Sequence, residues 1–265
     1  MKKIISIFAV ILLLLSCAAC GNKIEEKTGY TSVAKEEVYK NKYEDSNGDV
    51  SSTLEYHYPV LEGLSEDVSA SINYFFKDRI AKKEEELKKN ADNVTEYLNN
   101  FDIKGPQVTI IEYEEYYVDD YVASFIMKQR TATNPDEVEP TYEGISFSLT
   151  TGERLSVSKL TLPGKEEDTT SIIKARIITE ANNSYSSNGT AISDEKKELI
   201  NANYDEDNFV TDGNSLTFIY DYFTLSEGSK TGMYECYVNI DDMGGYMTPP
   251  AEYGKITETS SSISN

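Results

Sequence analysis

The sequence predicts an α+β fold in which one long and one shorter amphipathic helix pack on mostly antiparallel sheets. Runs of alternating apolar and polar residues occur in pairs joined by turn residues, as half-buried strands require. Two longer runs carry apolar residues at steps of three and four, which indicates a buried helix stripe. These helical runs separate groups of strands without the regular spacing of βαβ units, which favours α+β over a doubly wound fold.

The first hairpin is predicted from two strands over residues 32–44 and 49–60. The turn between them contains Asn47-Gly48, a strong hairpin signal when it stands between alternating runs. His57, the only histidine of the chain, falls on the polar face of the second strand. We interpret it as a solvated strand residue.

A long helix is predicted from Glu66 to about Asn99, with Ser65 as its N-cap. The charged segment at residues 82–89 is interpreted as a solvated face with Glu–Lys pairs one turn apart. The buried stripe is predicted to consist of Val68, Ile72, Phe75, Phe76, Ile80, Leu87, Ala91, Val94 and Leu98.

A second hairpin is predicted over residues 107–118 and 121–131, followed by a strand at 143–149. A turn at residues 150–153 is predicted to lead into a further short strand at 154–157. The inner face of the second hairpin is assigned to Tyr121, Ala123, Phe125 and Met127.

The second amphipathic helix is predicted at residues 168–181, and a short helix near 193–201. The densest apolar material lies at residues 208–240, which we expect to form core strands around which the rest is organised. Asp212-Gly213-Asn214 supplies the turn there. Cys236 falls on an apolar strand face and is interpreted as a small buried side chain.

The N-terminus carries the pattern of an export signal. Lys2 and Lys3 precede an apolar run at residues 4–15, which is too short to cross a bilayer, and small residues with cysteine follow. Residues 14–22, Leu-Leu-Ser-Cys-Ala-Ala-Cys-Gly-Asn, resemble a bacterial lipoprotein box. The resemblance implies lipidation of Cys17, with Cys20 as the alternative, and removal of residues 1–16 or 1–19. An ordinary cleaved signal peptide remains an alternative.

The mature chain is then divided as follows. A flexible tether is expected at residues 17–30, an N-terminal half at 31–135, a C-terminal half at 136–250, and a disordered tail at 251–265. Two or three acyl chains would hold such a chain at the extracellular face of the cell membrane.

The charge balance limits the partners. The formal net charge is −21, so nucleic acid is excluded as an expected partner, because phosphate backbones require Lys and Arg. A basic partner would be attracted, although an acidic surface also serves solubility. The twenty tyrosines suit a contact surface, and we expect an acidic, tyrosine-rich sheet face to make the contacts.

Two passages resemble a known family. Tyr56-His57-Tyr58-Pro59-Val60-Leu61 with Ser71-Ile72-Asn73-Tyr74-Phe75-Phe76, and residues 152–160 with 208–240, resemble the paired extracellular domains of RsiV anti-sigma factors and PdaC-type peptidoglycan deacetylases. The resemblance implies a binding or sensor domain of the cell envelope that takes lysozyme or peptidoglycan. The loop that would align with the family's partner-binding loop lacks its proline, and its centre is Leu225, Ser226, Glu227 and Gly228.

Catalysis and cofactors find little support in the residue types. One histidine cannot supply a common zinc site or a convincing triad, and no glycine-rich phosphate loop is present in the sequence. We therefore expect no catalytic residue, metal or cofactor. A wall hydrolase that uses paired carboxylates is one alternative, and a structural lipoprotein without a ligand is the other. The carboxylate sets are Glu112/Glu114/Glu115, Asp119-Asp120, Asp205-Glu206-Asp207 and Asp241-Asp242.

Overall fold

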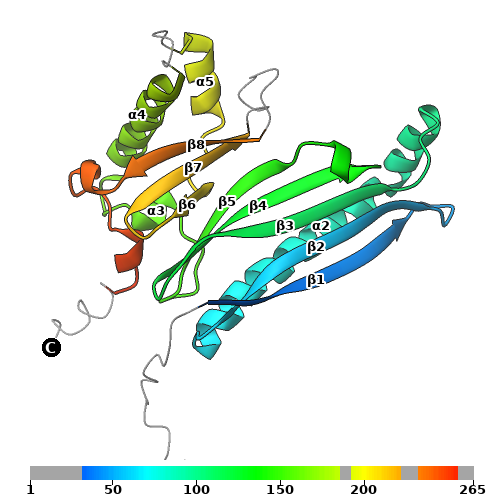
Figure 1. Ribbon diagram of the computed structural model, residues 1–265, viewed down its shortest axis with the longest axis horizontal. Helices are drawn as coiled ribbons and strands as arrows, with labels where there is room; N and C mark the ends of the chain where they lie inside the picture. Colours follow the sequence, from blue (N-terminus) through cyan, green and yellow to red (C-terminus); the bar gives the residue numbers. More distant parts are fainter. Residues whose placement is uncertain (1–31, 186–191, 222–231, 256–265) are drawn as a thin grey trace, which may run out of the picture.

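The computed structural model describes residues 32–185, 192–221 and 232–255, which form two sheets, one long helix and several short helices (Figure 1). The larger sheet consists of β1 (Ser32–Glu44), β2 (Val50–Glu62), β3 (Gln107–Val118), β4 (Val122–Ala132) and β5 (Thr141–Ser148). The smaller consists of β6 (Phe209–Thr211), β7 (Ser215–Asp221) and β8 (Met233–Asn239). The helices are α2 (Glu66–Asn100), α3 (Val157–Leu160), α4 (Glu166–Tyr185) and α5 (Asp194–Ala202). The predicted α+β class is confirmed.

The five strands of the larger sheet follow the order of the chain. Neighbouring strands are antiparallel except β2 and β3, which pair in parallel. Parallel neighbours need a crossover, and α2 provides it by carrying the chain back along the sheet. The spacing of the elements therefore did not reveal the single βαβ unit that β2, α2 and β3 form. A single crossover, made by a 35-residue helix, leaves no repeated spacing to detect.

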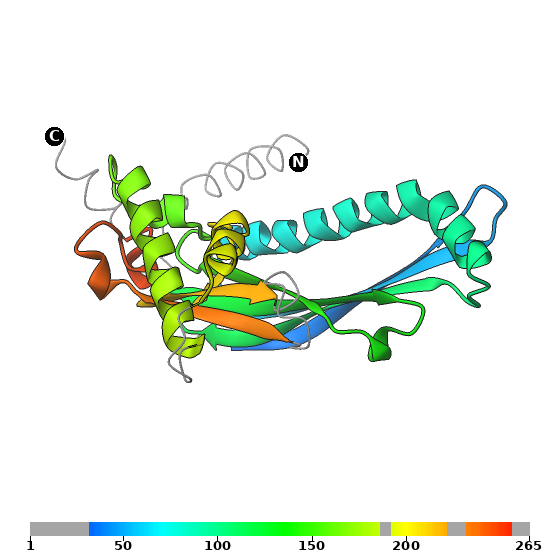
Figure 2. The same cartoon turned by 90° about the horizontal axis from the view of Figure 1, so that it is seen from above.

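The long helix α2 covers one face of the larger sheet along most of its length (Figure 2). The predicted stripe is confirmed, since the buried residues are Val68, Ile72, Phe76, Ile80, Leu87, Ala91 and Leu98. Phe75 and Val94 are half-buried. Ser65 is the N-cap residue, but its side chain makes no capping hydrogen bond. Its main-chain carbonyl instead accepts the first helical bond, from the Ser69 amide at 2.9 Å.

The hairpin between β1 and β2 forms as predicted. The Asp45 carboxylate accepts hydrogen bonds from the amides of Asn47 at 2.9 Å and Asp49 at 3.0 Å, and Gly48 adopts a φ of 87°. The Ser46 amide donates to the carboxylate of Asp92 on α2 at 2.7 Å, which ties the hairpin to the helix.

The strands β4 and β5 lie between two packed layers. Alternate residues face α2, namely Ala123, Phe125, Met127, Ile145 and Phe147. The intervening residues face the smaller sheet, where Ile126 packs with Val210 and Ile219. The sheet is therefore buried on both faces at this point, whereas β1, β2, β3 and the end of β4 keep one face open.

Serine side chains join the two sheets. The hydroxyls of Ser124 and Ser146 are 2.8 Å apart, and they donate to the main-chain carbonyls of Thr211 at 2.8 Å and Phe209 at 3.1 Å. Gly144 stands beside them, and a Cβ atom there would lie 2.6 Å from the carbonyl carbon of Phe209. Glycine is required because the backbone of β6 occupies the space of a side chain.

The smaller sheet packs against α3, α4 and α5. Leu216, Phe218 and Tyr220 share one core with the inward residues of β8. Those residues of β8 are Tyr234, Cys236 and Val238, with Ile240 directly after the strand. The prediction of a half-buried β7 was wrong, because its second face, with Thr217 and Ile219, is also buried. That face packs against β5.

Three local predictions need correction. Residues 154–157 form no strand, because Arg154 makes a single bridge to Phe147 and α3 begins at once. Tyr121 does not face inward but is 42% exposed, since the Asp119 carboxylate holds its amide in the turn at 2.6 Å. The chain stays ordered past Pro250 in a short 3-10 helix, and the Tyr253 hydroxyl donates to Glu153 at 2.9 Å.

The predicted boundary at residues 135 and 136 falls between β4 and β5, which pair with each other. The predicted leader and tether at residues 1–30, and the tail from residue 256, lie outside the described residues. Within the described ranges, no helix has the length and apolar character that a membrane crossing needs.

Candidate functional site

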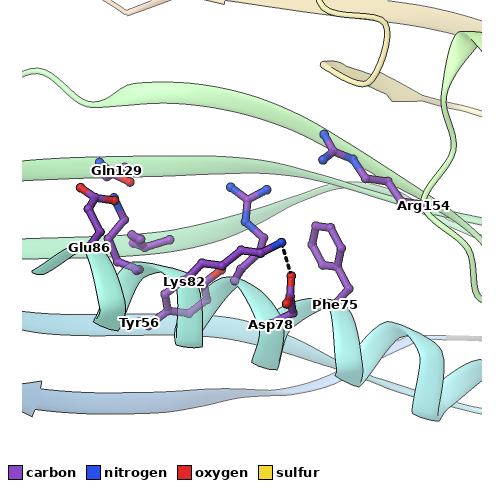
Figure 3. Close-up of a pocket in the computed structure, with 10 residues that line it drawn as sticks. Tyr56, Phe75, Asp78, Lys82, Glu86, Gln129 and Arg154 are labelled. Atoms are coloured by element: carbon purple, nitrogen blue, oxygen red, sulfur yellow. Dashed lines mark hydrogen bonds and ion pairs between the residues drawn. The ribbon is translucent and has the colours of Figure 1, made fainter. Parts of the chain in front are cut away.

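A cleft of about 340 Å³ opens between α2 and the larger sheet (Figure 3). This volume lies at the lower end of the range for small-molecule pockets. In Figure 3, Phe75, Asp78 and Lys82 rise from the helix, and Gln129 and Arg154 face them from the sheet side. The residues that line the cleft are Tyr56, Phe75, Asp78, Arg79, Lys82, Lys83, Glu86, Ile111, Gln129 and Arg154.

Two arginines share one carboxylate beside the cleft. The Arg79 Nη1 and Nη2 atoms donate to the two oxygens of Glu143 on β5, at 2.8 and 2.5 Å, and Arg154 Nη2 donates to one of those oxygens at 2.9 Å. The Phe75 ring lies near both guanidiniums, with its centroid 5.5 Å from the Arg79 Cζ and 5.7 Å from the Arg154 Cζ. Such paired, forked hydrogen bonds fix the guanidinium planes.

Burial and charge act in opposite directions on Glu143. Burial alone would raise the pKa of its carboxyl group, but the hydrogen bonds and charges of Arg79 and Arg154 keep that pKa below its usual range. Glu143 is therefore ionised at neutral pH.

A pair of phenols lies next to these groups. The hydroxyls of Tyr56 and Tyr113 are 2.6 Å apart, and burial raises the pKa of both. Both tyrosines are therefore neutral at physiological pH and act as hydrogen-bonding groups, without charge.

Two lysines of α2 frame the mouth of the cleft. Lys82 pairs with Asp78 at 2.6 Å and its side chain is 73% exposed. Lys83 pairs with Glu86 at 2.7 Å, but its side chain is only 18% exposed. Lys82 therefore stands at the surface, whereas Lys83 is largely covered.

Few tyrosines of the larger sheet lie where an acidic, tyrosine-rich contact face was expected, although Tyr116 on β3 is 40% exposed. The tyrosines of β1 to β3 pack mostly toward α2, and among them Tyr39 and Tyr43 donate to Glu84 at 2.7 and 3.2 Å. The interpretation of residues 82–89 as a solvated face was therefore wrong for Glu84, although its predicted pairing with Lys88 exists at 3.8 Å.

The open face of β1 and β2 instead carries ion pairs. His57 Nδ1 lies 3.0 Å from a Glu36 oxygen and Nε2 lies 2.7 Å from Glu55, which also pairs with Lys40 at 2.7 Å. The side chain of His57 is 18% exposed, so its interpretation as a solvated residue was wrong. The pattern showed a polar face but could not show that two carboxylates from neighbouring strands enclose the ring.

We predict that His57 titrates above pH 6.5. Burial would lower the pKa of the ring, but hydrogen bonds and charges from Glu36 and Glu55 outweigh it and raise that pKa. The stabilisation is thus complete below the unfolded pKa of about 6.5 and is lost as pH rises through the folded value. The single ring Cε1–H signal in a proton NMR titration measures this pKa. Glu36→Gln should lower it, and a wild-type value at or below 6.5 would contradict the prediction.

The carboxylate sets of the sequence are dispersed. Glu112 pairs with Arg130 at 2.9 Å and Glu114 pairs with Lys128, both on the open sheet face. The Asp119 carboxylate accepts hydrogen bonds from the amides of Tyr121 and Val122 within its own turn. The Asp205 carboxylate likewise accepts a hydrogen bond from the Asp207 amide at 2.9 Å. The structure therefore brings none of these pairs into the cleft under α2.

Asp242 does line a hollow, of about 160 Å³, together with Glu180 and Tyr237. Arg176 pairs with Asp242 there at 3.7 Å. The hollow is smaller than the usual range for ligand pockets, and its two carboxylates come from α4 and from the segment after β8.

Within the described part of the chain, no group of three His, Cys, Asp or Glu side chains could hold a metal ion. Cys236 is buried, and burial raises the pKa of its thiol to about 12, which confirms its interpretation as a small core residue. The predicted lipidation sites, Cys17 and Cys20, lie outside the described residues, as does the candidate loop with Leu225, Ser226, Glu227 and Gly228.

Sequence reasoning missed the arginine pair. Arg79 directly precedes Ile80, which belongs to the apolar stripe of α2. A charged side chain so close to a buried stripe is unexpected unless it is paired. Arginine is rare in this chain, which mostly uses lysine as its cation. These two signals could have marked Arg79, but nothing local connects it with Glu143 or Arg154.

A scan against protein-family models finds no match, and a search of curated proteins finds none. Solved structures do match. A DUF3298 family member from Bacteroides fragilis has a TM-score of 0.50 and 14% identity over 87% of this chain and 97% of its own. A DUF3298 family protein from Pseudomonas aeruginosa has a TM-score of 0.50 and 12% identity over 83% and 95%. This chain therefore shares its fold with DUF3298 family proteins.

Proposed function

We propose that this chain is a lipid-anchored protein on the extracellular face of a bacterial cell membrane, whose folded domain binds cell-wall peptidoglycan without transforming it. The cleft under α2 carries the binding role. It is large enough for part of a ligand, and guanidinium, ammonium, amide and aromatic groups line it. These groups recognise a ligand by hydrogen bonds, charge and stacking.

The proposed location at the membrane surface rests on the lipoprotein-like leader, with Cys17 as the acylated residue and Cys20 as the alternative. Incorporation of labelled palmitate, and its loss in Cys17→Ser but not in Cys20→Ser, tests the anchor. The comparisons add only the fold, which the chain shares with two DUF3298 family proteins.

A basic protein such as lysozyme is the second candidate ligand. The net charge of −21 favours it, and acidic side chains are concentrated at the start of α4, where Glu166, Glu167 and Asp168 occupy the first turn. Peptidoglycan is preferred because the cleft is too small for a protein domain and its lining is cationic.

Co-sedimentation with insoluble peptidoglycan sacculi tests the proposal, with the full chain in detergent. We expect saturable pelleting with no release of soluble muropeptides. Calorimetric titration of the same chain with lysozyme tests the second candidate ligand. Release of muropeptides would support the hydrolase alternative, and binding to lysozyme alone would support the second ligand. Binding to neither would leave a structural lipoprotein.

A further inference from the structure

The charge of the cleft is opposite to that of the chain. Four of its lining residues are cations, Arg79, Lys82, Lys83 and Arg154, whereas only Asp78 and Glu86 are anions. The whole chain has a net charge of −21. A locally positive, concave surface on an acidic protein concentrates an anionic ligand there and repels it elsewhere.

The arginine pair has capacity left after its internal bonds. Glu143 is one carboxylate shared by two guanidiniums. Arg154 Nη2 also donates to the main-chain carbonyl of Asp207 at 2.9 Å, but the Arg154 Nε is buried without a hydrogen-bond partner among the described residues. Two partly buried guanidiniums thus share one hydrogen-bonded carboxylate, and a carboxylate in the cleft would add a second counter-charge.

The carboxylate of Asp207 does not fill this role. Its Oδ1 is buried without a hydrogen-bond partner in the described part of the chain, and burial raises the pKa of this carboxyl group. Asp207 therefore acts on Arg154 through its charge, and its Oδ1 accepts no hydrogen bond from that guanidinium.

The other walls of the cleft suit an organic acid. Phe75, Tyr56 and Ile111 provide apolar and aromatic surface, and the Gln129 amide can both donate and accept hydrogen bonds. Arg79 binds the Glu143 carboxylate through two parallel hydrogen bonds, which is the geometry by which a guanidinium recognises a planar carboxylate. Inorganic phosphate would use the cations but not the apolar wall.

We infer that the cleft under α2 is a carboxylate-binding site, and that it takes a carboxylate-bearing peptide such as the stem peptide of peptidoglycan. This inference rests on the proposed binding function and names the part of the ligand that is recognised. The cations steer and hold the carboxylate, and the aromatic wall contacts the aliphatic side chains of the peptide.

Calorimetric titrations of the full chain in detergent test the inference with four soluble probes. These are a stem tetrapeptide, the same peptide with its carboxyl groups amidated, the neutral sugar diacetylchitobiose, and inorganic phosphate. We expect the free peptide to bind at least about tenfold more tightly than each other probe, because charge-assisted hydrogen bonds are lost with the carboxylates.

Lys82→Gln/Lys83→Gln removes two cations from the mouth and should weaken peptide binding about tenfold. The matched control, Lys40→Gln/Lys128→Gln, removes two ion-paired lysines of comparable exposure from the open sheet face and should change binding less than twofold. Gln129→Glu adds a carboxylate inside the cleft at almost constant volume and should also weaken peptide binding.

Equal binding of the free and amidated peptides, or equal losses in the cleft and control variants, would overturn the inference. So would phosphate binding as tightly as the peptide, or no binding of the peptide by the wild type. The proposed function would survive each result if the wild-type chain still pelleted with sacculi. It would fail with the inference only if that pelleting were also absent.

Discussion

Replacement of Gly144 by alanine is expected to lower the free energy of unfolding by about 3 kcal/mol. The new Cβ would lie 2.6 Å from the carbonyl carbon of Phe209 and 2.9 Å from its Cα atom. These are backbone atoms, so no rotamer change relieves the contact, and β6 has to move away from β5. That movement also lengthens the hydrogen bond from the Gly144 amide to Asn208 Oδ1, now 2.6 Å.

Urea denaturation followed by circular dichroism measures this loss, and Gly48→Ala is its control. Gly48 has a φ of 87°, and no atom lies within 4 Å of the position that a Cβ would take. Alanine at this position should therefore lower the free energy of unfolding by only about 1 kcal/mol, the cost of a left-handed backbone conformation for a residue with a Cβ. Hydrogen exchange of the Thr211 amide, which donates to the Ser124 hydroxyl at 3.1 Å, should accelerate only in Gly144→Ala. Equal destabilisation of the two variants would contradict the steric argument.

Local signals predicted most of the elements. The hairpin at Asn47-Gly48 and the stripe of α2 follow from turn chemistry and helical periodicity, which act between neighbours in the sequence. Both were confirmed because no distant contact competes with them. The boundaries of α5 were also close, since Ser193 accepts a hydrogen bond from the Lys196 amide at 3.2 Å and caps the helix.

The contact between the sheets could not be predicted in the same way. Ser124 and Ser146 alternate with apolar residues, which is the pattern of a strand with one wet face. In the structure this polar face is dry, because the two serine hydroxyls lie 2.8 Å apart and donate to carbonyls of β6. Alternation of polar and apolar residues shows which face of a strand is polar. It does not show whether a second layer covers that face and supplies hydrogen-bond partners for its polar groups.

The cleft was missed for a related reason. Arg79, Glu143 and Arg154 come from a helix, a strand and the bridging segment after β5, and Arg79 stands 64 positions before Glu143. Each of these residues is of a type that is common in its own segment, so no local pattern marks the three as parts of one site. Only the packing of α2 on the sheet, made by a parallel crossover that the spacing of elements did not reveal, brings Arg79 within reach of Met127 on β4 and Glu143 on β5.

The largest loss of stability is expected for Glu143→Gln, about 4 kcal/mol at pH 7. The substitution keeps the shape of the side chain but removes the single carboxylate that Arg79 and Arg154 share. Arg79 and Arg154 are only 24% and 23% exposed, so both guanidiniums would be left partly buried without their counterion. The control is Glu114→Gln, which breaks an exposed pair with Lys128 and should cost less than about 1 kcal/mol.

The dependence on pH separates this charge effect from a packing effect. Because the folded-state pKa of Glu143 is lowered, its contribution is present above the ordinary pKa of about 4.3 and disappears as pH falls through the folded value. The difference in unfolding free energy between wild type and Glu143→Gln should therefore be full at pH 7 and shrink in acid, below about pH 4. Urea denaturation at several pH values measures it. A difference that stayed constant into strong acid would mean that the amide perturbs packing, and that the shared ion pair contributes little to stability.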